Sequence, residues 1–128
     1  MTKEDEDLLL KDLCARLPYE VIVYGNYRYL DGDKIVDDEK VEVLNLSKLD
    51  WFVNGIEIKP YLRSISKLTE KEQFQLGRLM GAASYNMLKG EYSSLEEVLK
   101  YVYKNHIDLF GFIPKGLALE APEGMYSV

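Results

Sequence analysis

The strand-rich part of this chain opens with YEVIVYGNYRYL at residues 19–30 and closes with WFVNGIEI at residues 51–58. Both stretches are rich in the β-branched and aromatic side chains that favour strands. Gly25-Asn26 is a turn signal in the first, and Asn54-Gly55 in the second accepts the positive φ angles of a type I′ turn. Each stretch therefore predicts a β-hairpin, and together they predict an antiparallel sheet.

Helices are predicted on both sides of this segment. Thr2 is typical of a helix N-cap, and Pro18 ends the first helix. A capping box at 69–72 begins a second helix, and Ser93 or Ser94 caps a third. We expect one α+β domain over residues 1–128, with an antiparallel sheet of about four strands in two hairpins, flanked by one N-terminal and two C-terminal helices.

The charge of the chain is acidic and uneven. Its 128 residues include 22 Asp plus Glu and 16 Lys plus Arg, which gives a formal net charge of −6. The whole surplus lies in residues 1–39, which hold eleven acidic and five basic side chains. Proteins that neutralise nucleic-acid phosphates carry a basic surface instead. Direct nucleic-acid binding is therefore not expected.

The number of cysteines and the hydropathy of the chain indicate where in the cell the protein is located. The chain has one cysteine, Cys14, so it cannot form an internal disulfide. No apolar stretch approaches the length of a membrane span, and the first residues lack the pattern of a secretory signal. We expect a cytoplasmic protein that does not contact a membrane.

The apolar stripe of the first predicted helix contains Cys14 together with Leu9, Leu13 and Leu17. A thiol near the C-terminal end of a helix lacks the positive environment that favours a thiolate. We therefore expect Cys14 to be buried and unreactive.

Two further stretches predict packing surfaces. Gly77 and Gly81 are four residues apart on the long predicted helix, so a neighbouring helix of the same fold or a second subunit of a homodimer can approach closely there. The tail at 109–119 carries six large apolar side chains, and leaving them in water would forgo roughly 1.5–3 kcal/mol each. We expect this tail to pack on the helix face that carries Val98 and Val102, or on a second subunit.

Three stretches are similar, in order, to a known group of sequences: DLCARLPY at 12–19, IKPYLR at 58–63 and the segment at 108–122. Together they resemble a family of small uncharacterised proteins of Bacteroides-type gut bacteria and their phages or prophages. That family has an aromatic-Arg pair before the Gly of the third stretch, where this chain has Leu109-Phe110, so no role of that Arg is transferred. The resemblance implies a phage or mobile-element context and no particular activity.

The sequence lacks the motifs that identify a catalytic or cofactor site. It has no Gly-rich phosphate loop, and its Cys and His residues are too few for a structural zinc site. The five carboxylates between Asp31 and Glu39 do not have the spacing of a calcium loop. We expect no catalytic residue, no metal and no cofactor.

Aromatic side chains are the strongest indication of a binding surface, because Tyr and Phe are enriched where proteins meet. The candidate contact residues are Tyr19, Tyr24, Tyr27 and Tyr29 in the first predicted hairpin, and Phe110 and Phe112 in the tail. The leading hypothesis is a small non-enzymatic protein that binds an unidentified protein partner. The alternative is a small hydrolase whose Asp, Glu, Ser and Tyr side chains come together only in the fold. A structural subunit of a larger particle is a third, weaker hypothesis.

Overall fold

The structure is a computed structural model that describes residues 1–126. Its elements are α1 (Lys3–Arg16), the 3-10 turn η1 (Leu17–Tyr19), β1 (Ile22–Asp31), β2 (Lys34–Val43), α2 (Leu46–Val53), β3 (Glu57–Ser64), the 3-10 turn η2 (Ile65–Lys67), α3 (Glu70–Leu88), α4 (Ser93–Lys104), β4 (Ile107–Asp108) and β5 (Leu119–Glu120). The described chain is thus α+β, with four α-helices and a mixed sheet of five strands that is mostly antiparallel.

The sheet has the order β2-β1-β3-β4, and β5 also pairs with β3. β1 runs antiparallel to both β2 and β3, so this part of the sheet is antiparallel as predicted. The two short strands β4 and β5 run parallel to β3 and pair with its second half. The predicted α+β class is confirmed, whereas a strictly antiparallel sheet of four strands is wrong in detail because two segments from the end of the chain join it.

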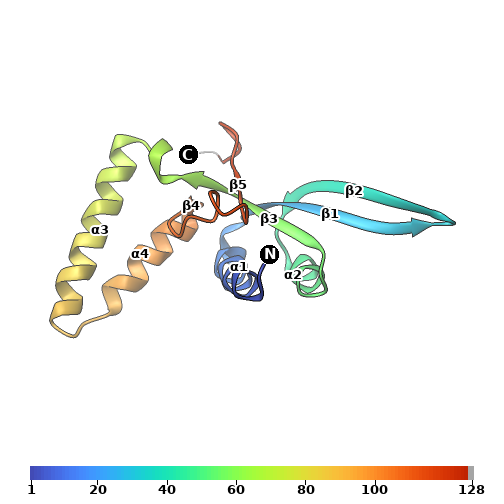
Figure 1. Ribbon diagram of the computed structural model, residues 1–128. Coiled ribbons are helices and arrows are strands. Elements are labelled where there is room, and N and C mark those ends of the chain that lie inside the picture. The colour runs from blue at the N-terminus through green and yellow to red at the C-terminus, as the bar shows by residue number, and fades with distance from the viewer. Residues whose placement is uncertain (127–128) are drawn as a thin grey trace.

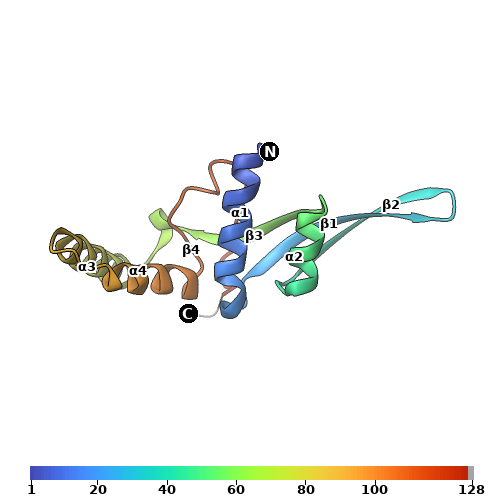
Figure 2. The same ribbon diagram turned by 90° about the horizontal axis from the view of Figure 1, so that it is seen from below.

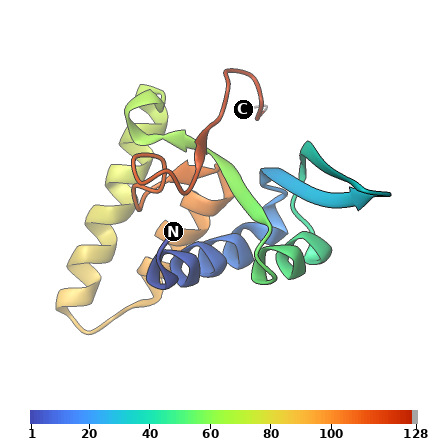
Figure 3. The ribbon, with the colours of Figure 1, turned by 45° about the vertical axis from the view of Figure 1, so that its right-hand side comes forward.

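The molecule has a small body from which two hairpins project in opposite directions. α1 and α2 lie side by side on one face of the sheet, and the chain end that includes β5 crosses the other (Figures 1 and 2). The β1–β2 hairpin extends from one end of the body, and the α3–α4 helical hairpin extends from the other (Figure 1). Figure 3 shows β3 as the strand that joins the two ends.

The predicted turn at Gly25-Asn26 is wrong, because β1 continues through both residues. Gly25 pairs with Lys40 of β2, and a Cβ atom at Gly25 would lie 2.5 Å from the hydroxyl oxygen of Tyr27. Glycine thus leaves room for the end of the Tyr27 side chain, which would have to move to admit a Cβ atom. The hairpin turns instead at the signal after Asp31, where Gly32 has a φ of 65°.

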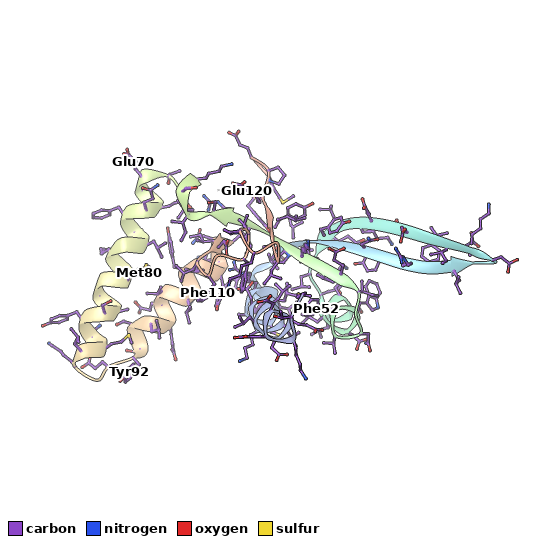
Figure 4. The ribbon with its side chains drawn as sticks, in the orientation of Figure 1. Phe52, Glu70, Met80, Tyr92, Phe110 and Glu120 are labelled. Carbon is purple, nitrogen blue, oxygen red and sulfur yellow. The ribbon has the colours of Figure 1, made fainter. Side chains whose placement is uncertain are left out.

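The predicted hairpin at Asn54-Gly55 is also wrong, because residues 46–53 form α2. The Asn45 side chain caps this helix by accepting a hydrogen bond from the Lys48 backbone N–H at 3.0 Å. Phe52 is buried in the core on the α2 side of the sheet (Figure 4). Gly55 follows the end of the helix with a φ of 95°, so the position still favours glycine.

The core consists of two clusters. The larger one joins α1, α2, β1 and β3 with the tail, and the smaller one lies between α3 and α4. Phe112, Leu117 and Ala118 of the tail are buried in the larger cluster, so the tail is part of the fold as predicted. Its predicted location against Val98 and Val102 is right only for Leu109.

Cys14 is exposed, which contradicts the predicted buried position. The side of α1 that faces the core carries Leu9 and Leu13 together with the charged pair Asp12 and Arg16. Because adjacent helical residues differ by about 100° in direction, Cys14 lies beside this buried side rather than on it.

The buried pair joins α1 to the far end of the chain. Arg16 is fully buried, and its Nε donates to the Asp12 carboxylate at 2.8 Å. Its Nη2 donates to the Ile107 carbonyl oxygen at 2.7 Å, and the guanidinium lies 5.1 Å from the centre of the Tyr103 ring. One side chain thus links α1, α4 and β4. Burial raises the pKa of Asp12, and the charge of Arg16 opposes that rise.

Replacing Arg16 alone should destabilise the protein strongly. Arg16→Met leaves the Asp12 carboxylate buried without its cation, and such changes cost about 3–5 kcal/mol. The double variant Asp12→Leu/Arg16→Met should recover much of this loss, because it removes both charges. Urea unfolding of the two variants tests the expectation. Equal unfolding midpoints for Arg16→Met and the natural protein would contradict it.

Candidate functional site

α3 has apolar side chains on two opposite sides. Leu76 and Ala83 are buried against α4. Phe74 and Leu88 point the other way, and their exposed fractions are 73% and 89%. A helix with apolar residues on all sides is normally buried on all sides. The second apolar side of α3 is therefore a surface that no other part of residues 1–126 covers.

We call this second side the outer face of α3. It consists of Phe74, Gly77, Gly81, Tyr85 and Leu88. These residues recur at spacings of three and four, which keeps them in one row along a helix. Figure 4 shows how α3 runs from Glu70 past Met80, with Tyr92 in the turn that leads to α4. The expectations from the sequence did not include this face, although the helical spacing of Phe74 and Leu76 already places them on opposite sides of the helix.

The two glycines leave a shallow gap in the outer face. A Cβ atom built at Gly77 or Gly81 would meet no other atom within 4 Å. The interpretation that a neighbouring helix of the same fold packs here is therefore wrong, because α4 lies against the opposite side of α3. A homodimer contact stays a prediction.

One flank of the outer face is basic. Lys71, Arg78 and Lys89 follow each other along it. No ion pair found within residues 1–126 involves any of the three. The Lys89 ammonium lies 4.5 Å from the centre of the Tyr85 ring. This flank thus presents positive charge that the rest of the described chain does not neutralise.

The β1–β2 hairpin extends beyond the sheet as an arm. Pairing of β1 with β3 ends at Asn26, so residues 27–38 form a two-stranded projection, which we call the arm. At its tip Leu30 pairs with Ile35, and their exposed fractions are 73% and 66%. The arm carries four acidic and two basic side chains. Its tip therefore combines exposed apolar side chains with negative charge.

The structure does not bring the predicted contact tyrosines together on one face. Tyr19 lies in η1 before the strand, and alternation along β1 puts Tyr24 on the side opposite Tyr27 and Tyr29. Tyr27 packs edge-on against Trp51, with ring centres 4.9 Å apart.

Tyr24 and Tyr29 differ in how accessible their side chains are to a partner. The Tyr24 hydroxyl donates to Glu39 at 2.9 Å, and this bond raises the pKa of Tyr24 to about 12. Tyr29 is half exposed near the tip of the arm. Of the four tyrosines, Tyr29 is thus the one that presents most of its ring to solvent.

The predicted contact residues of the tail differ in exposure. Phe112 is buried, and the neighbouring Phe110 is exposed, with ring centres 6.1 Å apart. Both line a groove of about 360 Å³ together with Leu8 and Tyr103. Only Phe110 offers a large apolar surface to a partner.

A polar cavity of about 580 Å³ is where a hydrolase site could be sought. Its lining includes Arg63, Thr69 and Glu120. Arg63 binds both carboxylate oxygens of Glu72 at 2.7 Å, and these bonds lower the pKa of Glu72 to about 2. Lys67 pairs with Glu120 at 2.8 Å. Both cationic side chains of the cavity are thus paired with a carboxylate, and the Arg63–Glu72 pair holds the start of α3 in place.

His106 is placed for stability rather than for proton transfer. Its ring stacks on Tyr126 with ring centres 3.8 Å apart, and burial lowers the pKa of His106 to about 4. The Tyr126 hydroxyl donates to the Tyr61 carbonyl oxygen at 2.7 Å and accepts from the Ile22 backbone N–H at 2.9 Å. At neutral pH the imidazole is therefore uncharged, and it helps fix the chain end to the sheet.

The described residues contain no group of three or more His, Cys, Asp or Glu side chains arranged to hold a metal ion. In the same part of the chain, every helix is too short or too polar to cross a bilayer. Comparisons with protein-family models, curated proteins and solved structures found no match.

Acid should destabilise the protein in two stages. The unfolded chain binds a proton at His106 near pH 6.5, whereas the folded chain does so only near pH 4, so stability falls by up to about 3 kcal/mol across that window. Glu72 adds a second loss between about pH 4.5 and 2, because the fold stabilises its carboxylate form.

Urea unfolding at a series of pH values measures both stages. The control is His106→Asn, because Asn tolerates the φ of 59° at this position. This variant should lose the upper stage and keep the lower one. A variant with the same pH profile as the natural protein would show that His106 does not cause the upper stage.

Proposed function

We propose that this chain is a small, non-enzymatic, cytoplasmic protein that acts by binding another protein through the outer face of α3. The observation that carries the proposal is the exposure of Phe74, Tyr85 and Leu88 in one row on a helix that already packs through its other side. Covering a side chain of this size contributes roughly 1.5–3 kcal/mol. The row therefore offers a partner a substantial apolar contact.

The shape of the outer face also supports a protein partner. Aromatic anchors beside a recess are typical of the residues that dominate binding energy at interfaces. Phe74 and Tyr85 are about 16 Å apart along the helix, and Gly77 and Gly81 lie between them in the same row, so a partner that covers the gap can also contact an aromatic ring beyond either end of it. Small residues in the middle let the partner approach the helix backbone closely.

Two further features support the proposal. Tyr29 and Phe110, both among the contact residues predicted from the sequence, are exposed and offer further aromatic surface away from the outer face, Tyr29 on the arm at the opposite end of the molecule (Figure 1). The resemblance of residues 12–19, 58–63 and 108–122 to proteins of gut bacteria and their phages supports a phage or mobile-element setting.

Phe74→Asp should weaken partner binding at least tenfold, because a charge would replace an apolar anchor in the contact. Its effect on the stability of the free protein should be small, since the side chain is mostly in water. The test places a photo-crosslinking residue at Leu88 and compares the cross-linked product with and without Phe74→Asp.

The matched control places the same photo-crosslinking residue at Val53, an exposed apolar position on α2. A discrete product from position 88 that disappears with Phe74→Asp supports the proposal. Equal cross-linking from both positions, or none from position 88, would contradict it.

A further inference from the structure

We infer that the partner of the outer face of α3 is a second copy of this chain, whose arm docks there so that copies join head to tail. This inference rests on the proposed function of the outer face. It assigns that surface an occupant, the tip of the arm at residues 30–35.

The two surfaces lie at opposite ends of one molecule. The arm extends from one end of the body and α3 from the other, in both perpendicular views (Figures 1 and 2). The arm of a molecule therefore cannot reach its own α3. Any contact between these surfaces has to join two copies.

The apolar parts of the two surfaces match in size. Leu30 and Ile35 are opposite each other across the hairpin, and such side chains are about 5 Å apart. Gly77 and Gly81 are separated by about 6 Å along the axis of α3. The two tip side chains can therefore fill the gap above the two glycines.

The charges of the two surfaces are complementary. Asp31 and Asp33 at the tip of the arm are exposed, and neither takes part in an ion pair within residues 1–126. The basic flank beside the outer face is also unpaired. Docking of the tip would bring these opposite charges together, which favours this register and speeds association.

A symmetric pairing of two α3 helices is the main competitor. If two α3 helices ran antiparallel and crossed between Gly77 and Gly81, Arg78 of both copies would lie close to the symmetry axis. Like charges opposed at an interface cost free energy. The arm supplies acidic groups to Arg78 instead, so the structure favours the head-to-tail contact.

A head-to-tail contact leaves one arm and one outer face unoccupied at the two ends of every assembly. Further copies can add until a ring closes, or without limit if it does not. The protein should therefore form a series of oligomers whose size rises with concentration.

Two variants test the inference by complementation. The arm variant, Leu30→Asp/Ile35→Asp, keeps an intact outer face, and the face variant, Phe74→Asp/Leu88→Asp, keeps an intact arm. All four positions are largely in water, so both variants should keep the fold, and circular dichroism with urea unfolding checks this. Sedimentation velocity over a wide concentration range measures assembly.

The natural protein should associate progressively, and each variant alone should stay monomeric. An equimolar mixture of the two should give a one-to-one heterodimer that grows no further, because it retains one working arm and one working face. Asp31→Lys/Asp33→Lys should weaken assembly at least tenfold, and pairing this variant with Lys71→Glu/Arg78→Glu should restore it.

Other outcomes overturn the inference. If the arm variant still self-associates while the face variant does not, the contact is the symmetric α3 pair. If the natural protein stays monomeric at every concentration, the outer face does not bind a second copy. In that case the cross-linking experiment decides the proposed function. A different protein cross-linked from position 88 would support it, and no cross-linked product would contradict it.

Discussion

The buried guanidinium of Arg16 is the contact on which the body of the molecule depends. It pairs with Asp12 one turn earlier in α1 and donates to the Ile107 carbonyl, so it ties the first helix to a strand that forms near the end of the chain. Asp12 Oδ1 and Arg16 Nη1 form no hydrogen bond within the described residues, so the buried charges are stabilised mainly by the contacts of Arg16 Nε and Nη2. α1 packs against the sheet, from which the β1–β2 hairpin extends, and Tyr103 of α4 covers the guanidinium. Arg16 therefore contacts elements that lead to both ends of the molecule.

Two hairpins project from the body because the body packs against only one end of each of them. β3 has partners along its length, but β1 pairs with it only from Val23 to Asn26, and the rest of the β1–β2 hairpin continues alone. At the other end the Arg63–Glu72 ion pair fixes the start of α3, and only α4 covers the helix beyond it. Exposed apolar side chains on both projections are the physical reason to treat this protein as one that functions in contact with another chain.

Local signals predicted the elements better than their arrangement. The caps at Thr2 and Thr69 formed as expected, because side-chain capping depends on a few neighbouring residues. The sequence alone could not show that Gly25 lies within a strand and not in a turn. The glycine there leaves room for the Tyr27 side chain, and this contact is visible only in the folded chain. The outer face of α3 could be predicted from the sequence, because the helical angle between Phe74 and Ala83 places these two residues on opposite sides of the helix. The Arg16 contact, by contrast, joins residues far apart in the chain, and no local pattern signals it.

The parallel pairing of β3 has a consequence for the order in which the protein can fold during synthesis. The β1–β2 hairpin and the α3–α4 pair are made of neighbouring segments, so each can form soon after its residues leave the ribosome. The second half of β3 lacks these strand partners until Ile107 and Leu119 have been made, because β4 and β5 pair with it there. During that interval the nascent chain exposes an unpaired strand edge. The synthesis of residues 107–120 therefore decides whether this part of β3 pairs with its own chain or with a neighbouring one.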